Sequence, residues 1–166
     1  MSFKNIPFGT FDVFNVVIEI PDGSRNKYEY DEAQDKIILD FVFSETFRWP
    51  YNYGYVPQTR GGDGDALDAV VFSNSAIESG TVVPVRAVGM IELLDRGEVD
   101  NKLLTIPAAD QTQAAFHDLP DLPAEYRERL EQLFIDLARE KQKKIEVLGF
   151  RNKERALKEL KQARIS

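Results

Sequence analysis

Over the first two thirds of the chain, apolar residues occur in short runs or alternate with polar ones, and turn residues separate the runs. The run at residues 16–20 is closed by Pro21, Asp22 and Gly23, which favour a turn. Residues 27–30 alternate with the period of two that is typical of a strand. Similar runs occupy residues 36–43, 69–72, 81–91 and 102–106. Short strands separated by turns predict a closed barrel or a sandwich.

The pattern changes to a helical period near residue 123. Apolar side chains then recur three or four positions apart, at Tyr126, Leu130, Leu133, Phe134 and Leu137. We predict a helix over 123–141, with Asp121 as its N-terminal cap and Pro123 in its first turn. A second helix is predicted to begin near Asn152. No linker composition separates the strands from the helices, so residues 1–166 are predicted to form one α+β domain.

Composition narrows the classes of function. Lys and Arg total 21 and Asp and Glu total 28 among 166 residues, so the net charge is −7. An acidic protein gains little from nucleic acid or an anionic membrane, and neither partner is expected. There is no cysteine and one histidine, His117, which excludes thiolate chemistry and a multi-histidine zinc site. Residues 1–14 do not resemble a signal peptide and no span of about 20 apolar residues occurs, so we expect a cytoplasmic protein.

The most informative segment is acidic and rich in glycine. Residues 61–68 read Gly-Gly-Asp-Gly-Asp-Ala-Leu-Asp and lead directly into an apolar run. The carboxylates of Asp63, Asp65 and Asp68 repel one another unless a cation neutralises them, and oxygen ligands suit a hard ion such as Mg²⁺. The alternative is a solvated acidic turn. A calcium-hand loop fits poorly, because its sixth position would hold Asp68 and its twelfth Asn74.

Other polar residues interrupt predicted strands. Glu19 lies in an apolar run, Lys27 and Glu29 share one strand face, and residues 95–102 form a second acidic stretch that contains Asp95, Asp100 and Lys102. Each of these, taken alone, is typical of a paired or exposed charge or of a hairpin loop. Together they supply carboxylates for metals and lysines for phosphate oxygens. The tyrosines of residues 51–55 are either further donors or core aromatics.

The ordered motifs resemble those of the soluble inorganic pyrophosphatases, from residue 16 to about residue 150. The resemblance is carried by residues 17–21 (Val-Ile-Glu-Ile-Pro), 27–29 (Lys-Tyr-Glu), 50–55 (Pro-Tyr-Asn-Tyr-Gly-Tyr), 63–68 and 95–102. It implies a single Mg²⁺-dependent domain with an α+β fold, in which two main helices pack outside a small closed OB-like β-barrel. Mn²⁺ is a possible substitute metal, and the family resemblance also implies a homo-oligomer, with a hexamer favoured.

The resemblance also implies roles for individual residues. Asp65 corresponds to the group that helps to deprotonate the attacking water. The implied metal ligands or their close partners are Asp63, Asp68, Asp100, Asp95, Glu19 and Glu29, with Asp68 reaching a second metal. The implied phosphate contacts are Lys27, Tyr53 and Lys102.

This chain departs from the family pattern at three places. Ala66 stands where the family has proline, and Phe41 stands where it has arginine. Residues 136–138, Asp-Leu-Ala, replace a tyrosine-lysine pair. The missing arginine, tyrosine and lysine contact phosphate in the family, so Arg48, Arg60, Lys141 and Lys143 are candidate replacements, whereas Ala66 is a mild change in the stiffness of the turn.

Three functions remain open at this point. The first is hydrolysis of inorganic pyrophosphate, and the second is hydrolysis of an organic diphosphate whose tail rests on Phe41. The third is metal and phosphate binding without catalysis, which the presence of Asp65 argues against. A generic barrel that binds oligosaccharides or nucleotides does not explain the set of carboxylates.

Overall fold

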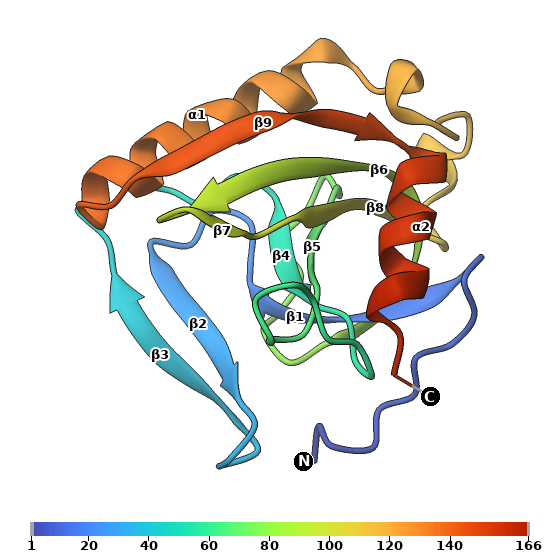
Figure 1. Cartoon of the computed structure of the whole chain (residues 1–166), viewed down its shortest axis with the longest axis horizontal. Helices are drawn as coiled ribbons and strands as arrows, with labels where there is room; N and C mark the ends of the chain where they lie inside the picture. Colours follow the sequence, from blue (N-terminus) through green and yellow to red (C-terminus); the bar gives the residue numbers. More distant parts are fainter. Residues whose placement is uncertain (1, 166) are drawn as a thin grey trace.

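A 7-stranded sheet forms the body of the molecule, and a two-stranded hairpin lies beside it (Figure 1). The computed structural model describes residues 2–165, so Met1 and Ser166, the ends of the predicted domain, lie outside the described residues. The strands are β1 (Phe14–Ile20), β2 (Asn26–Asp31), β3 (Lys36–Val42), β4 (Asn52–Tyr55), β5 (Asp68–Val71), β6 (Val82–Asp95), β7 (Glu98–Val99), β8 (Lys102–Pro107) and β9 (Ile145–Asn152). The helices are two 3₁₀ turns, Gln111–Gln113 and Leu119–Asp121, and the α-helices α1 (Ala124–Glu140) and α2 (Lys153–Ala163).

The strand pairings of the large sheet return to their starting point. Strand β1 pairs with β4, β4 with β5, β5 with β8 and β8 with β6, and β6 pairs again with β1. All of these pairs are antiparallel except β5 and β8. Strand β9 is added to the outer side of the ring through β6, and β2 and β3 form the separate hairpin. The ring brings the beginnings of β5 and β8 together, next to the ends of β1 and β6.

Both α-helices pack an apolar face on the sheet. Helix α1 buries Leu130, Leu133, Phe134 and Leu137, and α2 buries Ala156, Leu160 and Ala163. In Figure 1, α1 runs along β9 and α2 crosses the strand ends on the opposite side of the molecule from the hairpin. For α1, the helical period therefore predicted the buried face correctly, with Tyr126 partly buried at its edge. Among residues 2–165, no helix combines the length and the apolar character that are needed to cross a bilayer.

The predicted start of α1 is correct within a residue, but its predicted cap is wrong. Pro123 is the N-terminal cap residue and makes no side-chain hydrogen bond to the helix. The Asp121 carboxylate instead accepts the backbone N–H groups of His117 and Asp118, at 2.9 and 3.0 Å. It stabilises the preceding 3₁₀ turn, because a carboxylate satisfies whichever free N–H groups its backbone position presents. Asn152 caps α2 as expected, with its Oδ1 accepting the Arg155 N–H at 3.0 Å.

Strand β4 lies in the tyrosine-rich segment and is buried along its whole length. At its centre, Gly54 packs directly on the backbone of β1. A β-carbon added to Gly54 would lie 2.0 Å from the carbonyl oxygen of Val17, far inside van der Waals contact. Glycine is therefore required here for the close approach of two strands.

We predict that Gly54→Ala destabilises the protein by at least about 2 kcal/mol, because β1 and β4 would have to separate. The measurement is urea unfolding followed by circular dichroism. Gly62→Ala is the matched control, since the atom nearest to a β-carbon at Gly62 is 4.0 Å away. Equal stability of the two variants would show that the contact between Gly54 and Val17 does not constrain the fold.

Candidate active site

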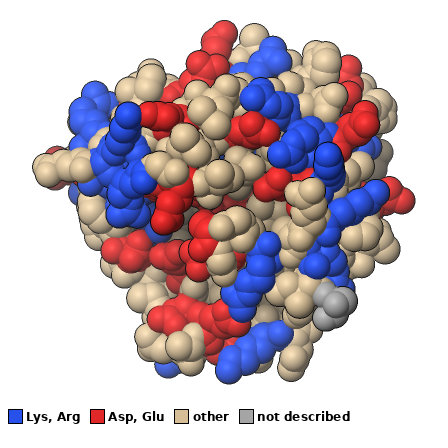
Figure 2. Space-filling model, viewed as in Figure 1, with Lys and Arg blue, Asp and Glu red and all other residues tan. Residues whose placement is uncertain are grey.

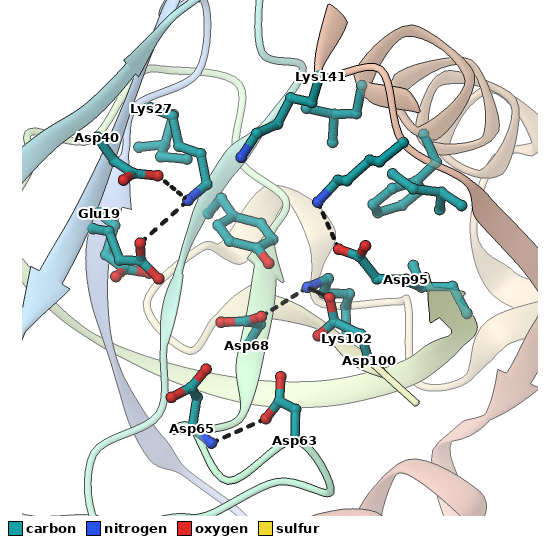
Figure 3. Close-up of a pocket in the computed structure, with 18 of the residues that line it drawn as sticks. Glu19, Lys27, Asp40, Asp63, Asp65, Asp68, Asp95, Asp100, Lys102 and Lys141 are labelled. Atoms are coloured by element: carbon teal, nitrogen blue, oxygen red, sulfur yellow. Dashed lines mark hydrogen bonds and ion pairs between the residues drawn. The ribbon is translucent and has the colours of Figure 1, made fainter. Parts of the chain in front are cut away.

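A cavity of about 350 Å³ lies between the β2–β3 hairpin, the loop before β5, the β6–β7 turn and the end of α1 (Figure 3). Each site residue predicted from the sequence lines it. Those residues are Glu19, Lys27, Glu29, Tyr53, Asp63, Asp65, Asp68, Asp95, Asp100 and Lys102. Figure 2 shows acidic and basic side chains next to one another on this face of the molecule. Residues separated by more than 80 positions in the chain are thus gathered around one space.

The parallel pairing of β5 with β8 builds the centre of the site. Asp68 and Lys102 are register partners at the beginnings of these strands. The Lys102 side chain is only 7% exposed, and its ammonium lies 2.7 Å from Asp68 Oδ2 and 2.9 Å from Asp100 Oδ2. It also lies over the ring of Tyr53, 5.4 Å from the centroid. Burial disfavours the charged lysine, but Asp68, Tyr53 and Asp100 together outweigh it, and the pKa of Lys102 is raised well above its usual value.

Glu19, on β1, is almost wholly buried, at 6% exposure. Its carboxylate accepts the backbone N–H of Tyr30 at 2.8 Å. Burial, and then the nearby Asp68, raise the pKa of Glu19 to about 8. A buried carboxylate of this kind holds a proton at neutral pH unless a cation comes close. This is the behaviour expected of a ligand whose metal binds at the same position.

The acidic loop is closed by its own backbone. The Gly61 N–H donates to the Asp65 carbonyl at 2.7 Å, and the Asp65 N–H donates to Asp63 Oδ1 at 3.0 Å. Gly64 has a φ of +87°, a conformation that glycine adopts without strain. Figure 3 shows the Asp63 and Asp65 carboxylates pointing from this loop toward Asp68. Burial and the charge of Asp63 raise the pKa of Asp65.

The opposite side of the cavity also consists of ion pairs. The Lys27 ammonium donates to Asp40 Oδ2 at 2.8 Å and to Glu29 Oε2 at 3.4 Å. Lys143 donates to Asp95 Oδ2 at 2.6 Å. Burial acts against the charged form of Asp95, but Lys143 and Arg96 together outweigh it and lower the pKa of that carboxyl.

Several lining residues were not assigned a role from the sequence. They include Asp40, Glu98 and Arg96, together with Lys141 and Lys143, which were only candidates. Asp40 could have been found from the sequence, because it lies in the predicted strand at residues 36–43, and this strand pairs with the strand that carries Lys27. Lys141 and Lys143 follow the end of α1, so the helical period of the sequence gives no indication that they line the cavity.

The other candidates lie elsewhere. Arg48 donates to the carbonyls of Glu45 and Phe47, and Arg60 pairs with Glu32. Among the described residues, neither arginine lines this cavity, and neither does Phe41. The Phe41 ring packs against the apolar core instead.

The chemistry of the donor set fits a hard divalent cation. The ligands available are carboxylate oxygens, as Mg²⁺ and Mn²⁺ prefer. As they stand, no three carboxylate or histidine side chains within residues 2–165 are close enough together to hold one ion. The ammonium of Lys102 lies within 3 Å of both Asp68 and Asp100 and neutralises part of their charge.

Two helices packed on a sheet that carries such a carboxylate site match the fold of pyrophosphatase structures. The inorganic pyrophosphatase from Thermus thermophilus superposes with a TM-score of 0.91 at 34% identity, covering 98% of this chain and 97% of the other. The inorganic pyrophosphatase from Coxiella burnetii gives 0.90 at 33% identity, covering 95% and 97%. In sequence, the inorganic pyrophosphatase of Thermoplasma volcanium is 39% identical over 155 residues, 92% of each chain.

The family model described as inorganic pyrophosphatase matches residues 16–165. The chain belongs to the inorganic pyrophosphatase family.

We predict that Mg²⁺ at about 100 times its dissociation constant raises the melting temperature by about 5–10 °C, because a ligand of the folded state contributes about 2.7 kcal/mol at that ratio. The measurement is scanning calorimetry of protein stripped with chelator, with NaCl at equal ionic strength as the control. Asp100→Asn should reduce the shift, whereas Asp136→Asn, outside the cavity, should preserve it. Equal melting temperatures in Mg²⁺ and NaCl would contradict a metal site.

Proposed function

We propose that this protein hydrolyses inorganic pyrophosphate to two phosphates with the help of several Mg²⁺ ions, for which Mn²⁺ can substitute. One observation carries the proposal: a single cavity gathers the carboxylates and lysines that this chemistry needs, in a chain of this family. Both parts are required, because carboxylates alone would repel the anionic substrate and lysines alone would provide no site for metals.

The carboxylates divide into groups by position. Asp63, Asp68 and Asp100 would hold the tight metal, with Asp68 reaching a second one. Glu19, Glu29 and Asp95 would bind further metals. When bound, these ions lower the pKa of a coordinated water and neutralise phosphate charge. The protein keeps the carboxylate ligands in place. Asp68 and Asp100 are close enough together to contact one cation, because both lie within 3 Å of the ammonium of Lys102.

The remaining residues act on the proton and the phosphates. Asp65 accepts the proton of the attacking water, and its raised pKa makes it a stronger base than an ordinary aspartate. Lys27, Tyr53 and Lys102 hold phosphate oxygens. Attack by water at one phosphorus breaks the bridging P–O bond, and the second phosphate leaves with the bridging oxygen. No covalent intermediate with the protein is involved.

The surroundings of Phe41 count against an organic diphosphate as the main substrate. That alternative depends on an apolar cavity wall for the organic tail. The Phe41 ring packs against the core, and the ammonium of Lys141 lies over its face. A tail would therefore meet a cation. A purely binding role is disfavoured by Asp65, whose carboxylate lines the cavity although binding alone does not need a base.

We also infer that the ring of strands is a closed, OB-like barrel and that residues 1–166 form one domain. The cyclic pairing of β1, β4, β5, β8 and β6, and the packing of both helices on the same sheet, support this. A homo-oligomer, with a hexamer favoured, is consistent with exposed apolar side chains such as Ile135 and Leu148. We also infer a cytoplasmic location, as expected from the sequence.

The test is phosphate release from pyrophosphate and from nucleoside and prenyl diphosphates, with Mg²⁺ and with excess chelator. We expect pyrophosphate to be preferred and chelator to abolish release. Asp65→Asn should lower kcat by roughly 10²–10⁴, the usual contribution of a general base, with Mg²⁺ affinity largely retained.

Asp68→Asn is the comparison, since it should weaken Mg²⁺ binding measured by calorimetry. Preference for a prenyl or nucleoside diphosphate, or full turnover in chelator, would contradict the proposal.

A further inference from the structure

Lys141 differs from the other cations of the cavity in having no acidic partner. Lys27 pairs with Asp40 and Glu29, Lys102 pairs with Asp68 and Asp100, and Lys143 and Arg96 both pair with Asp95. Within residues 2–165, no carboxylate oxygen lies within 4.0 Å of the Lys141 ammonium. A cation that lines an acidic cavity and has no carboxylate partner is available to an incoming anion.

The fold fixes where this ammonium lies. Lys141 is the residue after α1, and its backbone N–H closes the helix on the Leu137 carbonyl at 2.9 Å. The chain then reverses at Gln142, which has a φ of 51°. The Lys141 ammonium lies 5.3 Å from the centroid of the Phe41 ring, which itself packs at 4.8 Å on Phe43. Figure 3 shows the side chain extending into the cavity toward Lys27.

The cavity therefore has two chemically different ends. Besides burial, the neighbouring ammonium groups of Lys27 and Lys143 lower the pKa of Lys141, although Asp40 acts in the opposite direction. Three cations thus lie at one end, where Asp40 and Asp95 pair with Lys27 and Lys143 and leave Lys141 without an acidic partner. Asp65 lies near Asp63 and Asp68 instead, at the end formed by the acidic loop, and Glu29 lies between the two ends, since it acts on Asp65 and also pairs with Lys27. A molecule with two linked phosphates can place one at each end.

We propose that Lys141, supported on the ring of Phe41, binds the phosphate of pyrophosphate that lies farther from Asp65. The proposal rests on the proposed function. It implies that Lys141, the residue after α1, serves in place of the two cations that the family pattern has here, the arginine at position 41 and the lysine of the tyrosine-lysine pair. The phosphate-binding part of the site is then rebuilt with a different residue.

Two features favour Lys141 over its neighbours for this role. Lys27, Lys102 and Lys143 already donate to carboxylates, which neutralise part of their charge, whereas Lys141 has no ion pair that competes with phosphate. The aromatic face attracts the ammonium without accepting a conventional hydrogen bond, so its N–H groups stay available for phosphate oxygens.

The experiment compares Lys141→Met with wild type. Two quantities are measured at saturating Mg²⁺: kcat/KM for pyrophosphate, and the dissociation constant of inorganic phosphate by calorimetry. A hydrogen bond to a charged group corresponds to about a 10- to 100-fold change, and we expect this loss in kcat/KM and at least about tenfold weaker phosphate binding. Lys141→Arg should retain most of both.

Lys144→Met is the matched control. Lys144 lies three residues further along, is 77% exposed on its side chain and pairs with Glu146 outside the cavity. This variant should stay within about twofold of wild type on both quantities, as expected of an exposed ion pair. Melting temperatures establish that each variant is folded, and Lys141→Gln replaces Lys141→Met if the latter is not.

A second variant tests the link to position 41. Phe41→Arg introduced into Lys141→Met should recover phosphate affinity, because it returns a cation to the same end of the cavity. Absence of recovery would overturn the claim that the two positions serve one phosphate. Phosphate binding and kcat/KM of Lys141→Met both within twofold of wild type would overturn the role of Lys141.

The two proposals fail in different ways. If wild type releases no phosphate from pyrophosphate, the proposed function is wrong. The comparison of phosphate binding between wild type and Lys141→Met still decides whether Lys141 binds phosphate.

Discussion

The ion pairs that Lys102 makes with Asp68 and Asp100 are the interaction on which this site depends. Carboxylates gathered in a partly buried cavity repel one another, and the repulsion is severe where water is excluded. The ammonium of Lys102, 7% exposed on its side chain and within 3 Å of both acids, neutralises the centre of this charge. Lys27 and Lys143 do the same at the margin. The protein thus holds an arrangement of acids that suits metals by pairing it with its own cations.

The fold makes this arrangement possible through one parallel pair of strands. Because β5 and β8 run in the same direction, Asp68 and Lys102 begin neighbouring strands and face the same space. Strand β4 closes the adjoining wall, and its Gly54 permits the approach to β1 that carries Glu19. The β2–β3 hairpin then covers one side with Lys27 and Asp40, and the end of α1 covers the other with Lys141. The rigid ring positions the acidic centre, while peripheral segments supply the cations at the margin.

The sequence predicted the centre of the site better than its margin. Charged residues such as Glu19 and Asp68 interrupt or begin apolar strands, so they could be recognised as candidates from the sequence. The order of the motifs then indicated that they belong to one site. Strand β9 was missed because its half-exposed residues do not alternate clearly, and without β9 the turn that carries Lys141 and Lys143 could not be placed. The cap assigned to Asp121 was wrong because two N–H groups of the preceding turn compete for its carboxylate. From the sequence, Phe41 was expected to form an apolar wall of the cavity. The position of its ring beside the Lys141 ammonium depends on tertiary packing, which the sequence pattern does not indicate.

The most direct test of this account is a crystal structure of the protein at saturating Mg²⁺, compared with one of chelator-treated protein. If protein cations hold the place of metals, Mg²⁺ should bind between Asp68 and Asp100. The Lys102 ammonium, 2.7 and 2.9 Å from these carboxylates in the computed structure, should then turn toward the phosphate side of the cavity. Retention of both ion pairs at saturating Mg²⁺, with no ion bound to either carboxylate, would contradict the account.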